Sequence, residues 1–201
     1  MGVYVPYGKR TIDLVGAALL LIALSPVLVA AALLVRVFLG APILFRQART
    51  GLHGRIFTLL KLRTMTDRRD RQGNLLPDDQ RIGRLGSFLR KSSIDELPEL
   101  VNVLRGDMSL VGPRPLLPEY LDRYTPEQRR RHLVMPGLTG WAQVRGRNAL
   151  TWPARFALDV EYVERQSFAF DLWIVLLTPW SIVTARGIGH QGQVTMYEFK
   201  D

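Results

Sequence analysis

"LVGAALLLIALSPVLVAAALLV", residues 14–35, is a run of 22 residues without a charged side chain. A run of this length and polarity is long enough for one helical crossing of a bilayer. Ser25 and Pro26 stand at its centre, and a proline inside a helix removes one backbone hydrogen bond and clashes with the preceding turn. The sequence therefore predicts an N-terminal membrane helix that breaks or bends sharply at Ser25-Pro26. The Ser25 hydroxyl is the expected local partner for a freed carbonyl.

The topology of this segment has three candidate forms. It could be a kinked helix that spans the membrane, a re-entrant helix–break–helix that enters and leaves by the same face, or a signal peptide cleaved near residues 30–32. Lys9 and Arg10 precede the segment and further arginines follow from Arg36 onward, so the flanks show no charge asymmetry. Cleavage would place the basic remainder outside the cell, where nucleotide substrates are scarce. We therefore favour the re-entrant form for residues 1–40.

The charge of the chain is concentrated in its middle. The 201 residues include 27 Lys and Arg against 18 Asp and Glu, a formal net charge of +9. Residues 46–91 hold twelve basic and four acidic side chains, whereas residues 92–201 are nearly balanced. Such a positive field indicates a phosphate-rich partner: a nucleotide, a nucleic acid or an anionic lipid headgroup. The chain has no cysteine, which excludes disulfides, thiolate metal sites and cysteine nucleophiles.

The rest of the chain predicts an α+β domain over residues 41–201 that is mostly helical, compact and interfacial, with little sheet. Residues 56–62 are expected to form a strand of a hairpin-like entry. Helices are expected at 84–91, 97–104, 126–133 and 152–165. Residues 170–183 are very apolar but contain Pro179 and are too short to span, which favours a buried or interfacial helix.

The stretch "SSIDELPELVNVLRGDMSLVGPRP", residues 92–115, contains two adjacent carboxylates, Asp95 and Glu96. Ser93 and Glu96 have the spacing of a capping box, which gives the pair a purely structural interpretation. A helix N-terminus close to Arg90 and to the rigid Gly-Pro-Arg-Pro turn around Arg114 is, however, an anion site. Phosphate would repel a carboxylate there, unless that carboxylate is a nucleophile or a metal ligand. The residues alone leave both interpretations open.

Two other basic pairs are candidate binding residues. Lys61 and Arg63 lie on the same side of an extended segment and could face a phosphate. Arg145 and Arg147 stand near Trp141, and an aromatic–guanidinium surface could hold a base or a sugar. A solvated strand face and a packing tryptophan with solvated arginines are the structural alternatives.

Several of these stretches together resemble one family, the small monotopic phosphoglycosyl transferases of bacteria, or PglC-like sugar transferases. The matching pieces, in order, are "KRTID" (9–13), "LSPV" (24–27), "FRQARTG" (45–51), "KLRTM" (61–65), the stretch 92–115 quoted above, and "PGLTGWAQVRGRN" (136–148). The likeness runs from about residue 7 to residue 197. No single piece is specific, but the series in this order and spacing is.

The resemblance implies an enzyme that transfers a sugar-1-phosphate from a UDP-sugar to polyprenol phosphate (undecaprenyl phosphate). The products would be polyprenol-diphosphate-sugar and UMP, in the first membrane step of glycoconjugate and polysaccharide assembly. It also implies a monotopic, re-entrant protein at the cytoplasmic face of the bacterial inner membrane, and a Mg²⁺ requirement. By position, Asp95 is the nucleophile that forms an aspartyl-phosphosugar intermediate. Glu96 is its partner, either as a metal ligand beside Asp95 or in handling the acceptor's proton.

The predicted site follows from these motifs. The expected substrate-binding residues are Lys61, Arg63, Arg90, Arg114, Arg145, Arg147 and Asn148. The expected partners are the UDP-sugar, the polyprenol phosphate and the lipid bilayer, with a homo-oligomer left open. Two rival functions are a membrane-anchored nucleic-acid-binding protein and a non-catalytic scaffold. Nucleic acid is not expected, because the basic run lacks the interleaved aromatic residues of a single-strand groove.

Overall fold

The computed structural model describes residue 4, residues 8–146 and 149–184, and residue 199. The fold is mostly helical with little sheet, as predicted. Its elements, in chain order, are α1 (Lys9–Phe38), β1 (Leu44–Thr50), η2 (Leu52–Gly54), β2 (Ile56–Leu62), α2 (Asp78–Arg81), α3 (Arg84–Ser92), η3 (Ile94–Glu96), α4 (Glu99–Arg105), β3 (Ser109–Val111), η4 (Pro118–Arg123), α5 (Pro126–Arg129), η5 (Arg130–Leu133), β4 (Gly137–Thr139), α6 (Trp141–Arg145), α7 (Trp152–Arg165) and α8 (Phe168–Val183), where η marks a 3-10 helix.

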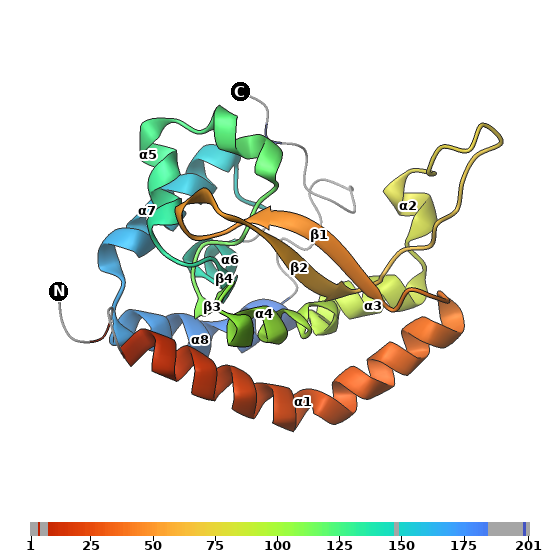
Figure 1. The fold of residues 1–201 in the computed structure, drawn as a ribbon, viewed down its shortest axis with the longest axis horizontal. Helices are drawn as coiled ribbons and strands as arrows, with labels where there is room; N and C mark the ends of the chain where they lie inside the picture. Colours follow the sequence, from red (N-terminus) through yellow and green to blue (C-terminus); the bar gives the residue numbers. More distant parts are fainter. Residues whose placement is uncertain (1–3, 5–7, 147–148, 185–198, 200–201) are drawn as a thin grey trace.

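α1 is one helix with a marked bend in its middle, and it runs along one whole side of the molecule (Figure 1). Pro26 lies inside it and has no N–H to donate to the carbonyl of Ile22, four residues earlier. The Ser25 hydroxyl donates to that same carbonyl at 2.8 Å. The predicted bend and its hydroxyl partner are therefore present, but the chain stays helical through the proline instead of breaking into two helices.

Both arms of α1 pack against the rest of the chain. In the first arm, Ala17 is fully buried in a cluster with Leu100 and Met108. In the second arm, Val35 is fully buried against Leu62 and neighbouring apolar residues. The bend thus lets a 30-residue helix touch the same globular part at two separated places.

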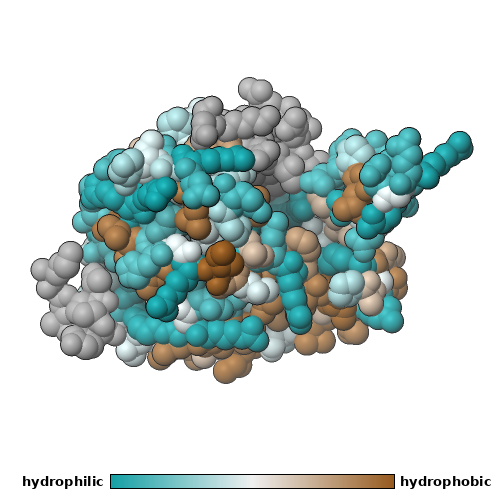
Figure 2. Space-filling model, turned by 45° about the horizontal axis from the view of Figure 1, so that its top comes forward, coloured by the Kyte–Doolittle hydropathy of each residue, from teal (hydrophilic) through white to brown (hydrophobic). Residues whose placement is uncertain are grey.

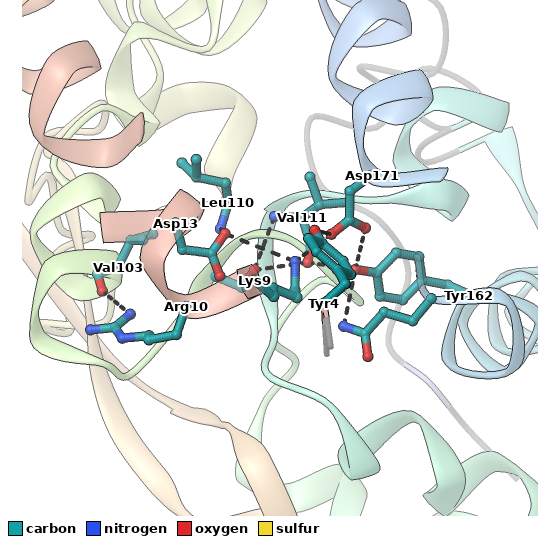
Figure 3. A network of polar contacts seen from close by, with 11 residues as sticks. Tyr4, Lys9, Arg10, Asp13, Val103, Leu110, Val111, Tyr162 and Asp171 are labelled. Atoms are coloured by element: carbon teal, nitrogen blue, oxygen red, sulfur yellow. Dashed lines mark hydrogen bonds and ion pairs between the residues drawn. The ribbon is translucent and has the colours of Figure 1, made fainter. Parts of the chain in front are cut away.

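A buried polar network fixes the N-terminal end of α1 (Figure 3). Lys9 Nζ donates to the Asp171 carboxylate on α8 at 2.7 Å, and the Tyr162 hydroxyl donates to the other oxygen of Asp171 at 2.7 Å. One turn along α1, the Asp13 carboxylate accepts from the backbone N–H of Leu110 at 3.1 Å. This end of the helix is therefore tied to α7, α8 and β3.

The outer side of α1 is apolar and uncovered. Within the described ranges, α1 is the one helix long and apolar enough to cross a membrane, and only 11% of its most apolar 18-residue stretch is buried. α8, the helix expected over residues 170–183, also exposes large apolar side chains, among them Trp173 and Trp180; its place at a membrane interface stays a prediction. Figure 2 shows hydrophobic residues gathered along the lower edge of the molecule, where α1 lies.

The sheet is limited to two small pairs. β1 and β2 form an antiparallel hairpin, with register from Leu44↔Leu62 to Thr50↔Ile56, which confirms the predicted strand and hairpin. β3 and β4 form a short parallel pair with Ser109 opposite Gly137. The predicted helix at 152–165 is α7. The one at 126–133 divides into α5 and η5, with the expected cap at Thr125.

Candidate active site

One cavity brings most of the predicted site residues together. It has a volume of about 630 Å³ and lies between the β1–β2 hairpin, the α3–η3 segment and the residues that follow β3. Four of the seven predicted substrate-binding residues line it with both carboxylates: Lys61, Arg63, Arg90 and Arg114, together with Asp95 and Glu96.

The short helix η3 carries Asp95 and Glu96 between α3 and α4. Ser93 ends α3 in a left-handed conformation (φ 57°), and its hydroxyl makes no capping hydrogen bond. The predicted capping box is therefore wrong. The Glu96 carboxylate instead binds two cations, and such ionic hydrogen bonds are stronger than a single bond to a backbone amide.

Glu96 is held as an anion by its neighbours. Its carboxylate accepts from Lys61 Nζ at 2.7 Å and from the Arg114 guanidinium. Burial alone would raise the pKa of Glu96, but the charges of Arg114 and Lys61 outweigh burial and lower it. Glu96 is consequently ionised at neutral pH and fixes the positions of both cations.

Asp95 has the opposite surroundings. Its side chain is 6% exposed, faces the cavity and receives no hydrogen bond from the described part of the chain. Burial raises the pKa of Asp95 to about 6, and the adjacent Glu96 charge adds to the rise against the opposing charge of Lys61. A carboxylate that is ionised at neutral pH but poorly solvated is suited to nucleophilic attack.

Glu99 belongs to the same cluster, although it was not predicted. It is 2% exposed, and its carboxylate lies 3.1 Å from Lys61 Nζ without satisfying hydrogen-bond geometry. Burial raises the pKa of Glu99 to about 7, while Lys61 opposes the rise. The i, i+3 spacing of Glu96 and Glu99 was the available signal, since it places both carboxylates on one helical face.

Asn102 is a second residue that the sequence did not reveal. Its side chain is fully buried, accepts from the Leu60 N–H at 3.1 Å and donates to the Thr58 carbonyl at 2.8 Å. These two bonds join α4 to β2. They set the strand that carries Lys61 against the helix that carries Glu99.

The turn after β3 holds Arg114 in place. Gly112 passes so close to the neighbouring backbone that a Cβ atom there would lie 2.3 Å from the Met135 carbonyl oxygen. The Arg114 carbonyl accepts from Arg131 at 2.6 Å, and Arg131 is itself paired with Asp159 at 2.8 Å. This support fixes the backbone on which the Arg114 guanidinium is mounted.

Arg63 and Arg90 stand at the end of the cavity close to the C-terminal arm of α1. Arg63 donates to the Ala41 carbonyl at 2.9 Å and pairs with Asp67 at 3.2 Å. Arg90 donates to the Thr64 hydroxyl at 3.0 Å. Burial lowers the pKa of Arg90, an effect that the Asp95 charge opposes.

The remaining predicted residues lie elsewhere. Arg145 is exposed and stacks over the Trp141 ring at 4.9 Å, which forms the expected aromatic–guanidinium pair. Trp141 donates to Glu161, and neither it nor Arg145 lines the cavity. Arg147 and Asn148 lie outside the described residues. A substrate role for these three residues stays a prediction.

Asp95 and Glu96 are also the candidate metal ligands. Among the described residues, no group of three histidine or carboxylate side chains is placed to hold a metal ion. Mg²⁺ in proteins is often bound by one or two carboxylates, with substrate phosphates and water completing its shell. Asp95 has no hydrogen bond from the described residues and Glu96 is ionised, so the pair is chemically compatible with such a shell; the Mg²⁺ requirement itself stays a prediction.

Comparison with known proteins gives consistent matches along the chain. The family model described as bacterial sugar transferase matches residues 4–185. The uncharacterized sugar transferase EpsL of Bacillus subtilis (strain 168) is 52% identical over 191 residues, which cover 95% of each chain. Two proteins named UDP-glucose:undecaprenyl-phosphate glucose-1-phosphate transferase also match. The one from Caulobacter vibrioides is 47% identical over 88% of this chain and 70% of its own length. The one from Escherichia coli (strain K12) is 40% identical over 85% of this chain and 39% of its own length.

Proposed function

The chain belongs to the bacterial sugar transferase family, and from that membership we propose that it transfers a sugar-1-phosphate from a UDP-sugar to polyprenol phosphate. The products are UMP and polyprenol-diphosphate-sugar. One observation carries the proposal: Asp95, a buried carboxylate that receives no hydrogen bond from the described residues, faces a cavity that Lys61, Arg90 and Arg114 also line. The names of the relatives point to undecaprenyl phosphate as the acceptor.

In the first step, an Asp95 carboxylate oxygen attacks the phosphorus that bears the sugar. The bond from this phosphorus to the bridging oxygen breaks, and UMP leaves with that oxygen. Lys61 and Arg114, held in place by Glu96, lie where negative charge spreads over the transferred phosphoryl group. A phosphosugar ester of Asp95 remains.

In the second step, a phosphate oxygen of the polyprenol phosphate attacks the same phosphorus. The bond to Asp95 breaks, and the carboxylate is restored. Bound Mg²⁺ would neutralise phosphate charge in both steps, with Asp95 and Glu96 as its protein ligands. Glu96 keeps Lys61 and Arg114 in position throughout.

The apolar helix explains how a water-soluble donor and a lipid acceptor meet. We propose that α1 enters and leaves the cytoplasmic leaflet by the same face, so that the cavity stays at the interface. Two observations support this: α1 bends at Pro26, and both of its arms pack on the same globular part. A site at the membrane surface confines the search for the acceptor to two dimensions and positions both reactants.

A half-reaction assay tests this proposal. The detergent-solubilised protein is mixed with a panel of UDP-sugars and Mg²⁺ without acceptor, and UMP and intact protein mass are measured. One donor should release about one equivalent of UMP and add one phosphosugar mass to the peptide that contains Asp95. Adding undecaprenyl phosphate should then remove the adduct and restore turnover. Release of UMP only when both substrates are present would exclude the covalent intermediate. No release with any donor would overturn the proposed activity.

A further inference from the structure

Arg49 is a cavity residue that the mechanism above does not use. It lies on β1, on the same strand face as Phe45 and Gln47, and all three side chains line the cavity. β1 packs against η4, so Arg49 stands at the end of the hairpin away from α1. Because side chains alternate along a strand, Arg49 points its guanidinium into the cavity, between the hairpin and η4.

Among the described residues, no carboxylate forms an ion pair with Arg49. Its Nη2 donates to the Gln47 side-chain oxygen at 2.6 Å, but its Nε is buried without an acceptor in the described part of the chain. Two other cations that line the cavity, Lys61 and Arg114, are both paired with Glu96. Burial lowers the pKa of Arg49 to about 10, and the nearby Arg114 charge adds to this.

A half-buried guanidinium with a free donor, next to a second cation, is unfavourable unless an anion completes it. Arg114 connects the two parts of the cavity, because it binds Glu96 and is close enough to Arg49 to affect its pKa. The cations therefore form a series from Lys61, beside Asp95, through Arg114 to Arg49. Tyr120 and Trp152 also line the cavity, but both are buried in the aromatic cluster behind it, with ring centroids 5.6 Å apart.

We propose that Arg49 binds the phosphate of the donor that departs with the nucleoside, which makes it a leaving-group residue. The inference rests on the proposed function. When the Asp95 oxygen bonds to the sugar-bearing phosphorus, the electron pair of the broken bond stays on the bridging oxygen. That oxygen belongs to the nucleotide phosphate, whose negative charge rises by one unit. A fixed guanidinium there stabilises the developing charge, and no proton transfer is needed.

Nucleotide binding tests this role without requiring turnover. The affinities of UDP and UMP are measured by isothermal titration calorimetry on the detergent-solubilised full chain, for the wild type, Arg49→Gln and Arg46→Gln. Arg46 is the matched control, since it is exposed on the opposite face of the same strand. Arg49→Gln should weaken UDP and UMP binding roughly ten- to a hundredfold, the usual effect of losing a charge-assisted bond. Arg46→Gln should leave both affinities within about twofold of the wild type. Arg49→Lys keeps the charge without the forked donors, so it should have an intermediate affinity.

The half-reactions separate this inference from the proposed function. Arg49→Gln should slow the UMP burst with donor alone. The second step, measured by mixing the purified phosphosugar adduct with undecaprenyl phosphate, should slow as well, because in-line attack brings the acceptor phosphate to the position that UMP has left. Wild-type UDP affinity in Arg49→Gln, or no UDP binding by the wild type, would overturn the role of Arg49. If UDP binds through Arg49 but no UDP-sugar releases UMP, the inference stands and the proposed activity fails.

Discussion

Two consecutive carboxylates in this chain have opposite chemistry because their neighbours differ. Glu96 binds Lys61 and Arg114 and has a lowered pKa, whereas Asp95 receives no hydrogen bond within the described residues and has a raised one. These surroundings let Glu96 organise the cations, and they suit Asp95 to the nucleophilic role that we propose for it. Each role has a measurable consequence.

The raised pKa of Asp95 predicts an acid limit for the first half-reaction. Only the ionised carboxylate can attack phosphorus, and burial places its pKa at about 6. The second-order rate constant for UMP release should therefore be constant above pH 7 and fall about tenfold per pH unit below about pH 5. A rate that stays level down to pH 4.5 would show that Asp95 ionises like an exposed aspartate.

The same raised pKa predicts that the ionised Asp95 carboxylate lowers the stability of the folded protein. Because the folded-state pKa of about 6 lies above the ordinary value of 3.8, the folded form binds this proton more tightly than the unfolded form. Folding stability attributable to Asp95 is thus fully present below the unfolded pKa and is lost as pH rises through 6. Asp95→Asn should abolish the adduct yet raise the free energy of unfolding at pH 7.5 by on the order of 1–3 kcal/mol. Thermal melts at pH 7.5 and pH 4 should show the gain shrinking at the lower pH.

Arg114 and Arg69 provide a contrast between a fixed and a solvated cation. Arg114 is bonded to Glu96 and faces the cavity, whereas Arg69 is exposed and donates to the Gly73 carbonyl in the 66–81 segment. Arg114→Ala should lower turnover by about a hundredfold or more, because a preorganised charge beside the phosphates is lost. Arg69→Ala should change turnover less than about twofold, since solvent and salt screen its charge. Equal losses would mean that the Gly-Pro-Arg-Pro turn is only structural.

At the scale of residues, the sequence indicated charged residues that lie inside motifs. It did not indicate the contacts that the fold makes between residues distant in the sequence. Asp95 and Arg114 stood out as part of a carboxylate pair and of a rigid basic turn, and Lys61 as one of two cations on an extended segment. The nucleophilic role of Asp95 was assigned only by the family resemblance. Arg49 lies in one of the matched pieces, yet nothing local shows that its Nε has no acceptor among the described residues. The capping-box interpretation is wrong for the same reason. The cations that bind Glu96 are Lys61 on β2 and Arg114 in the turn after β3, both distant in the sequence.

At the scale of elements, α1 shows how far a local rule extends. The bend follows from Pro26 alone, and so does the use of the Ser25 hydroxyl on the Ile22 carbonyl. That the helix continues through Pro26 does not follow from the local sequence. It depends on α4, α3 and β2, which pack against the two arms. The three-residue strands β3 and β4 were also unpredictable, since their pairing is set by close glycine contacts between distant segments.

Replacing the proline tests whether the bend sets the path of α1. Pro26→Ala restores an N–H for the Ile22 carbonyl and removes the steric clash, so a straight 30-residue helix becomes available. Such a helix is roughly 45 Å long and can cross the bilayer completely. We expect part of the protein to adopt a spanning state and activity in membranes to fall. Ser25→Ala leaves the proline in place, so it should retain most of the activity.

At the scale of the whole molecule, the proposed function requires a water-soluble donor and a lipid acceptor to meet at one site. The cavity lies beside the C-terminal arm of α1, because Arg63 lines it and also binds the carbonyl of Ala41, just after that helix. In the proposed function, the donor enters from water, while a lipid phosphate approaches along the exposed apolar residues of α1 and α8. The re-entrant path proposed for α1 requires both ends of this helix to be on the cytoplasmic side.

The absence of cysteine makes that topology directly measurable. The single substitution Val5→Cys introduces a thiol before α1 in the sequence. In a second variant, Ala48→Cys introduces a thiol after it. If the helix is re-entrant, both thiols should resist a membrane-impermeant maleimide in intact cells and react fully after lysis. In the Pro26→Ala background, some Val5→Cys protein should become labelled in intact cells, because a straight helix carries the N-terminus across the bilayer. Ala48→Cys should stay protected there, since the catalytic part keeps its side. Labelling of Val5→Cys in intact cells without the proline change would mean that α1 is a kinked spanning helix, and that the site reaches the lipid phosphate from a single membrane crossing.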